Sequence, residues 1–98
     1  MATGGPDHRP RPKFDWEGGN EEKLLMRHKV SALEAEQCFV NPHTIRKAEG
    51  DAYLLLGKTD GGRMLLLVYQ QKPGGVVRVY SAREMTERER RAFQRQVR

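Results

Sequence analysis

The side chains best suited to chemistry are concentrated between Val76 and Thr86, a segment that reads VVRVYSAREMT. It contains Arg78, Tyr80, Arg83 and Glu84. Arginine presents a planar fork of donors that matches the oxygens of a phosphate group. Guanidinium groups fixed near a strand end therefore suit a phosphate ligand, and we expect the functional site here.

His28 and Lys58 complete the set of candidate site residues. The residue types in this set can bind a phosphodiester, shuttle a proton and stabilise charge that develops in a transition state. The sequence has no zinc spacing, phosphate-binding glycine loop, nucleophile elbow or carboxylate-rich metal loop. We therefore expect no metal and no cofactor.

Each candidate also has a structural interpretation, and composition and spacing leave these open. His28 can be a helix-edge histidine bonded to a backbone carbonyl. Tyr80 can be a packing residue. The two arginines can form ion pairs, Arg78 across the sheet with Glu49 or Asp51 and Arg83 with Glu87.

The pattern of the same segment predicts a strand that ends near Ser81. Alternation places Val77, Val79 and Ser81 on one face, and Val76, Arg78 and Tyr80 on the other. After the strand, Thr86 and Glu89 form a capping box that starts a charged C-terminal helix. Its thin apolar stripe consists of Ala92, Phe93 and Val97, so this helix can pack only lightly.

The preceding residues predict the elements that support this strand. Helical spacing indicates a short helix over residues 21–28. A second helix starts after a capping box at Ser31 and runs to about Val40. Short β-rich runs separated by turn residues follow at residues 44–47, 52–58, 63–70 and 76–81, and residues 14–16 form a short anchor. The fold class is therefore α+β, with short helices packed on an antiparallel β-meander and a charged C-terminal helix.

The inner stripes of the two helices are predicted separately. In the first helix, Leu24 and His28 share one face with Leu25 beside them, which places His28 at the edge of the buried stripe. In the second, Cys38 lies on the inner face and is most simply a small buried hydrophobe.

Composition limits the remaining possibilities. The 98 residues contain one cysteine and carry a net charge of +5, with the basic excess at the two ends of the chain. Residues 1–12 are predicted to form a disordered tail, and residues 13–98 a single domain. The sequence has no membrane or signal segment, so we expect a cytoplasmic protein whose basic ends suit either a polyanion or an acidic protein.

The order and spacing of short residue groups resemble the BrnT family, the ribonuclease toxins of bacterial type II toxin–antitoxin systems. The resemblance covers roughly residues 13–95. It is carried by Phe14-Asp15-Trp16, Arg27-His28-Lys29-Val30-Ser31, Glu34-Ala35, Phe39, Asn41-Pro42, Gly57, Leu67-Val68-Tyr69, Arg78-Val79-Tyr80-Ser81-Ala82-Arg83 and Glu89-Arg90-Arg91.

The resemblance implies a RelE-like fold and metal-independent cleavage of RNA that inhibits translation. It implies an antitoxin partner of BrnA type, whose ribbon-helix-helix domain contacts DNA, so that this chain meets DNA only indirectly. By position, the implied catalytic residues are His28, Arg78 and Arg83. In RelE-like enzymes, such groups together activate the 2′-hydroxyl, hold the scissile phosphate and protonate the leaving oxygen, and the resemblance does not assign these three roles one to one. Lys58, Tyr80 and Glu84 are expected to bind substrate.

The chain departs from the family pattern at four positions. The family commonly has lysine, asparagine, glycine and arginine where this chain has Asn20, Leu24, Lys29 and Ala52. Loss of one phosphate-stabilising donor commonly costs about 10²- to 10³-fold in rate. The alternative function is therefore a weakened or inactive binding module that docks an acidic protein or RNA. A DNA-binding protein is less well supported, because no helix-turn-helix or ribbon-helix-helix pattern is present.

Overall fold

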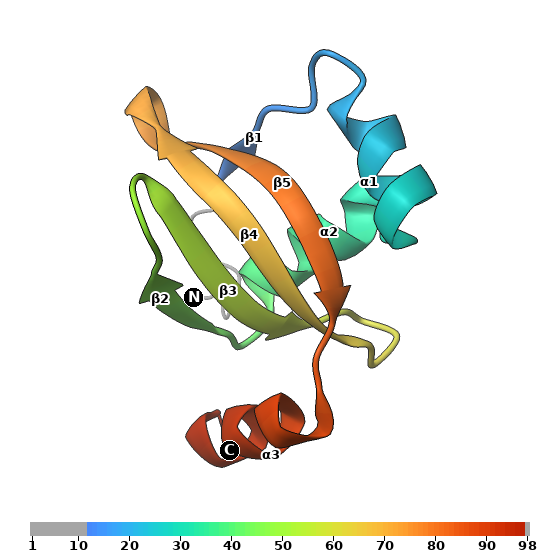
Figure 1. Ribbon diagram of the computed structural model, residues 1–98, viewed down its shortest axis with the longest axis vertical. Helices are drawn as coiled ribbons and strands as arrows, with labels where there is room; N and C mark the ends of the chain where they lie inside the picture. The colour runs from blue at the N-terminus through green and yellow to red at the C-terminus, as the bar shows by residue number, and fades with distance from the viewer. Residues whose placement is uncertain (1–11, 98) are drawn as a thin grey trace, which may run out of the picture.

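The computed structural model describes residues 12–97. Within them, five strands form one sheet in the order β1-β5-β4-β3-β2 (Figure 1). The strands are β1 (Lys13–Phe14), β2 (Thr44–Lys47), β3 (Ala52–Lys58), β4 (Met64–Lys72) and β5 (Val76–Glu84). β2 to β5 are antiparallel neighbours, and β1 pairs parallel to β5. The predicted meander is confirmed, with β1 added at its edge. The predicted tail lies outside the described residues except for Pro12.

Three α-helices occur in residues 12–97, namely α1 (Asn20–His28), α2 (Ala32–Val40) and α3 (Glu87–Gln96), and the short 3-10 turn η2 (Pro73–Gly75) joins β4 to β5. The two predicted capping boxes are present. The hydroxyls of Ser31 and Thr86 accept hydrogen bonds from the amides of Glu34 and Glu89, and these glutamates accept from the cap amides in return. No helix in this part of the chain is long and apolar enough to cross a membrane.

α2 packs against one face of the sheet (Figure 1). Its inner positions, Ala35 and Cys38, are fully buried. A β-carbon placed on Gly57 would lie 2.9 Å from the carbonyl oxygen of Cys38, so β3 approaches α2 very closely. Burial raises the pKa of the Cys38 thiol to about 12. Cys38 is thus a buried core residue, as predicted.

α1 packs along β5 by a narrower face than predicted. Leu24 is 1% exposed, whereas Leu25, one residue further around the helix, is 50% exposed. Asn20 is buried and its Nδ2 donates to the carbonyl oxygen of Val79 at 2.7 Å. β1 pairs only with the first residues of β5, so Asn20 satisfies a carbonyl that would otherwise be unpaired at the edge of the sheet.

α3 lies on the opposite face of the sheet, at one end, where Figure 1 shows it below the strands. Phe93 is its one buried residue among those described. Phe93 contributes to a hollow together with Leu54, Leu56 and Leu66, which point away from α2. The prediction of a lightly packed terminal helix agrees with this arrangement, and most of that face of the sheet has no helix over it.

Candidate active site

A β-bulge in β5 interrupts the regular pairing between β4 and β5. β4 pairs Val68 with Ser81 and then Tyr69 with Val79. Tyr80 is therefore an extra residue with no partner opposite it. Such a bulge reverses the alternation of the strand from that point on and re-aims the side chains that follow.

The bulge places Arg78 and Arg83 on the same face of the sheet. Strict alternation would put these two residues, five apart, on opposite faces. Beyond the bulge, Ala82 instead joins Val79 in the core. The prediction that Ser81 shares the face of Val79 is therefore wrong, and the strand continues to Glu84 rather than ending at Ser81.

Both arginines lie on the face opposite α2. Directly paired residues share a face, and the register pairs Gln70 with Arg78 and Leu66 with Arg83. Leu66 contributes to the hollow beneath Phe93 of α3, which identifies the face. We call this surface the open face. Its side chains from β2 to β5 include Arg46, Ala52, Leu54, Val68, Gln70, Arg78, Tyr80, Ser81 and Arg83, and Leu56, Lys58 and Leu66 lie on it toward α3.

Arg78 is held by the N-terminal segment. Its Nη1 lies 3.2 Å from Asp15 Oδ1, and its Nη2 donates to the carbonyl oxygen of Glu17 at 3.2 Å. Lys72 also pairs with Asp15, at 3.2 Å. The Glu17 amide above all, with help from Lys72 and Arg78, holds the pKa of Asp15 below its ordinary value. Arg78 therefore forms its ion pair with Asp15. The alternative prediction of a pair across the sheet with Glu49 or Asp51 is wrong.

Arg83 is held by α3. Its Nη1 and Nη2 donate to the two carboxylate oxygens of Glu89 at 2.7 and 2.8 Å. This bidentate bond raises the pKa of Arg83 and lowers that of Glu89 to about 2. The partner predicted by the structural interpretation was Glu87, and the structure corrects it to Glu89. The guanidinium fork of Arg83 thus already holds a planar anion.

Tyr80 lies between the two arginines along β5. Its side chain is 47% exposed, and its hydroxyl donates a short hydrogen bond to Oε1 of Gln70 on β4. An exposed aromatic side chain of this kind suits stacking on a nucleobase. Tyr80 is therefore available on the open face and is not a buried packing residue.

His28 ends α1 near the C-terminal end of β5, but in the helical layer. Arg63 shows this proximity, because its Nη1 donates to the carbonyl oxygen of Lys29 and its Nη2 to Glu84. His28 is half-buried. Within residues 12–97 its imidazole has no hydrogen bond to a backbone carbonyl, so the structural interpretation of this histidine is not supported.

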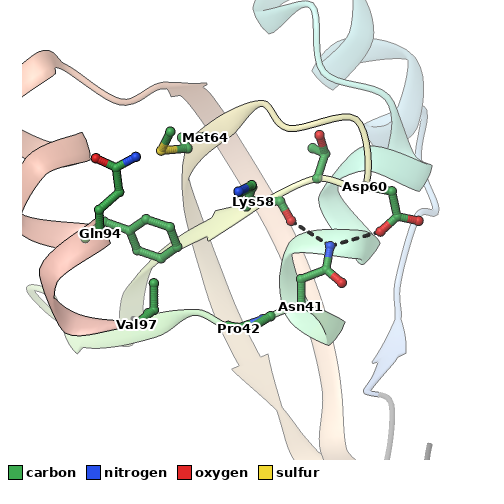
Figure 2. A pocket seen from close by; sticks show the side chains of 9 residues that line it. Asn41, Pro42, Lys58, Asp60, Met64, Gln94 and Val97 are labelled. Atoms are coloured by element: carbon green, nitrogen blue, oxygen red, sulfur yellow. Dashed lines mark hydrogen bonds between the residues drawn. The ribbon is translucent and has the colours of Figure 1, made fainter. Parts of the chain in front are cut away.

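Lys58 lies away from the β5 residues, at the end of β3. It contributes to a pocket of about 510 Å³ between α3 and the β3–β4 turn, with Met64, Phe93 and Val97 among the apolar residues around it (Figure 2). Figure 2 also shows Asn41, whose Nδ2 donates to the carbonyl oxygen of Lys58 at 2.8 Å. Lys58 therefore belongs to the region beneath α3.

Glu84 faces the helical layer rather than the open face. It lies two residues after the buried Ala82, and its carboxylate pairs with Arg63 at 3.2 Å. Arg63 in turn pairs with Glu34 of α2 at 3.0 Å. The structure thus brings Arg78, Tyr80 and Arg83 together on one face, and places Lys58 on that face beneath α3. Glu84 and His28 lie toward the helical layer.

Several residues that shape the site were not predicted from the sequence. The sequence pattern places Asp15 in an apolar anchor and Gln70 in a strand with no further role. It identifies Glu89 only as a capping residue. Asp15 reaches Arg78 because β1 pairs in parallel with β5, and no local sequence pattern predicts that pairing. Among residues 12–97, no group of three or more metal-ligating side chains converges.

The fold and the site together define a small α+β protein whose open sheet face presents arginine side chains suited to a phosphate-bearing ligand. The family model for the ribonuclease toxin BrnT of type II toxin–antitoxin systems matches residues 16–89. The chain therefore belongs to the BrnT family of ribonuclease toxins.

A solved structure has the same fold. The crystal structure of the Brucella abortus ribonuclease toxin BrnT superposes with a TM-score of 0.60 at 13% sequence identity, covering 78% of this chain and 96% of that one. At this identity the likeness concerns the fold alone. No curated protein matches the chain.

Proposed function

We propose that this chain is the toxin of a type II toxin–antitoxin pair and cleaves RNA internally, without a metal ion, so that translation is inhibited. The β-bulge at Tyr80 carries the proposal, because it turns Arg78 and Arg83 onto one open face. Their Cα atoms are separated by about 13 Å along the strand. Two arginines that reach toward each other across this distance can enclose one phosphodiester.

The proposed reaction uses the 2′-hydroxyl of the RNA as the nucleophile. Its proton passes to a base, and the oxygen attacks the adjacent phosphorus. The bond to the 5′-oxygen breaks and that oxygen takes up a proton, which leaves a 2′,3′-cyclic phosphate and a 5′-hydroxyl. We assign charge stabilisation to Arg78 and Arg83 and base stacking to Tyr80. His28 ends α1 in the helical layer and not on the open face, so we propose no direct contact between His28 and this phosphate.

The existing ion pairs affect how the arginines act. The fork of Arg83 is occupied by Glu89, so a phosphate has to replace that carboxylate. Arg78 has only part of its five donors committed, to Asp15 and to Glu17. We propose that Arg78 binds the phosphate first and that Arg83 changes partner as the RNA settles on the open face.

An antitoxin of BrnA type is the proposed protein partner. Its ribbon-helix-helix domain would contact DNA, and its remaining residues would cover the open face of this chain. The arginines favour an acidic segment in that position. This arrangement blocks RNA access and restricts contact with DNA to the antitoxin.

The test is cleavage of a synthetic RNA by purified protein in the presence of EDTA, with the product ends identified, together with growth after controlled expression. Wild type should cleave the RNA and arrest growth. Arg83→Ala should lose about 10²- to 10³-fold in rate.

Glu89→Gln keeps the capping box but removes the competing charge, so it should cleave at least as fast as wild type. Arg91→Ala removes an equal charge from the exposed side of α3 and should change nothing.

The ion pairs also favour a second candidate function, the binding module. Arg78 and Arg83 are both paired with carboxylates, and Ala52 contributes no guanidinium to the open face. A module of this kind would bind RNA or an acidic partner without turnover. Binding by wild type with no new RNA ends, even for Glu89→Gln, would replace the ribonuclease proposal with this one.

A further inference from the structure

Arg46 is a basic residue on the open face that no role has yet explained. It lies in β2, where it pairs with Leu54 of β3, and the same register continues to Val68 of β4 and Ser81 of β5. Arg46 therefore lies in one row with the bulge beside Tyr80. The row crosses three gaps between strands, about 14 Å in all.

The side chain of Arg46 is exposed and has no ion pair or hydrogen bond within residues 12–97. Arg78 and Arg83, in contrast, are both paired with carboxylates. An exposed arginine with no intramolecular partner contributes little to the fold. Its guanidinium remains free to bind an external anion.

The surface between Arg46 and β5 is neutral and partly apolar. Its residues are Ala52, Leu54, Val68 and Gln70, all half-buried. No acidic side chain projects from the strands in this row. α3 borders the row at Leu54, where Glu89 lines the same hollow as Arg46, and Glu49 and Asp51 lie in the turn between β2 and β3. A nucleic acid strand places bases on apolar surface and phosphates on cations, so this surface matches a single strand.

We propose that the RNA strand crosses the open face from β5 to β2, and that Arg46 binds the phosphate of a nucleotide beyond the scissile one. This inference rests on the proposed function, which it extends from a cleavage site to a binding track. It identifies the substrate as single-stranded RNA long enough to span four strands. Arg46 acts in affinity rather than in the chemical step.

The test compares Arg46→Ala with Lys47→Ala. Lys47 is the next residue in β2, carries the same charge and points to the other face, where its Nζ lies 5.1 Å from the centre of the Tyr53 ring. Binding and single-turnover cleavage are measured for a long single-stranded RNA and for a minimal RNA that covers only the cleaved linkage. Arg46→Ala should bind the long RNA about tenfold more weakly.

With the minimal RNA, Arg46→Ala should equal wild type, because that substrate does not reach β2. Arg46→Lys should recover part of the affinity for the long RNA. The track is refuted if Arg46→Ala and Lys47→Ala lose affinity equally, if the long RNA is unaffected, or if the minimal RNA shows the same loss. If wild-type protein binds no RNA, both this inference and the proposed function are wrong. If wild-type protein binds RNA but does not cleave it, the proposed function fails, and the binding affinities of Arg46→Ala and Lys47→Ala still test the inference.

Discussion

At the scale of single residues, the two arginines of β5 are held by carboxylates that point toward opposite ends of the strand. Arg78 turns to Asp15, next to β1, and Arg83 turns to Glu89 of α3. The guanidinium groups are thus fixed by anions in the same way as an RNA phosphate would fix them. We infer that substrate binding is an exchange of partners, with part of its free energy offset by breaking these pairs.

The Arg83–Glu89 pair also predicts how stability depends on pH. The hydrogen bonds from Arg83 lower the pKa of Glu89 from 4.5 to about 2. A lowered pKa in the folded state means that the stabilisation is complete above pH 4.5 and is lost as pH falls toward 2. Because half of the Arg83 side chain is exposed, the effect should be below about 1 kcal/mol.

The measurement is the free energy of unfolding in urea across this pH window, for wild type and for Glu89→Gln. The difference between the two proteins should shrink as the pH is lowered, because both then carry a neutral side chain at position 89. Other carboxylates, such as Asp15, titrate equally in both proteins. Parallel curves across the window would show that the ion pair contributes nothing.

At the scale of elements, the sequence predicts regular structure well and its interruptions poorly. Capping boxes at Ser31 and Thr86 and turn residues between the β-rich runs are local signals, and the corresponding helices and strands are present. The bulge at Tyr80 depends on the pairing of β5 with β4, which no local pattern encodes. The sequence therefore predicts that Arg78 and Tyr80 lie on a strand, as they do on β5, but misjudges where the strand ends and the face on which Ser81 lies.

The departures at Asn20 and Lys29 acquire physical explanations only from the structure. Asn20 satisfies the edge carbonyl of Val79, a contact 59 residues distant in sequence. Lys29 ends α1 with φ 58°, a left-handed conformation in which glycine is the least strained residue. The sequence identified both positions as unusual, but long-range hydrogen bonding and backbone geometry explain their roles.

The close approach of α2 to β3 leads to a prediction about Gly57. A β-carbon at this position would lie 2.9 Å from both the Cys38 carbonyl oxygen and Cδ2 of Leu55. The backbone oxygen cannot move aside without shifting α2. Gly57→Ala should therefore destabilise the fold by about 1–3 kcal/mol, measured by urea unfolding.

Gly61→Ala is the matched control, because the nearest atom to its added β-carbon, Thr59 Oγ1, is 3.9 Å away. This surface change should cost less than about 0.5 kcal/mol. Equal stability of the two variants would mean that α2 and β3 separate easily. That outcome would contradict the close packing of the covered face.

At the scale of the whole molecule, the two faces of the sheet differ in how much of each is covered by helices. α1 and α2 accompany the face that holds the buried core, whereas α3 lies over only one end of the other. Arg78 lies on the uncovered part, whereas Arg46 and Arg83 lie at its border with α3. Much of the net charge of +5 comes from the terminal segments. RNA binding could therefore depend on a few ordered arginines or on the total charge of the chain.

Salt dependence distinguishes these two possibilities. Neutralising three phosphates with Arg46, Arg78 and Arg83 predicts a slope of about −2 for log K against log salt, so affinity should fall about 20-fold between about 50 and 200 mM salt. Replacing any one of the three with alanine should reduce the slope by about 0.7, whereas Arg91→Ala should leave it unchanged. If the full net charge of +5 drove binding, affinity would fall about 100-fold over the same range. Every arginine variant would then change the slope alike.

Fluorescence anisotropy with a labelled single-stranded RNA at several salt concentrations measures both the affinity and its salt dependence. A slope steeper than about −2 that changes equally for every arginine variant would refute binding by a defined row of arginines on the open face.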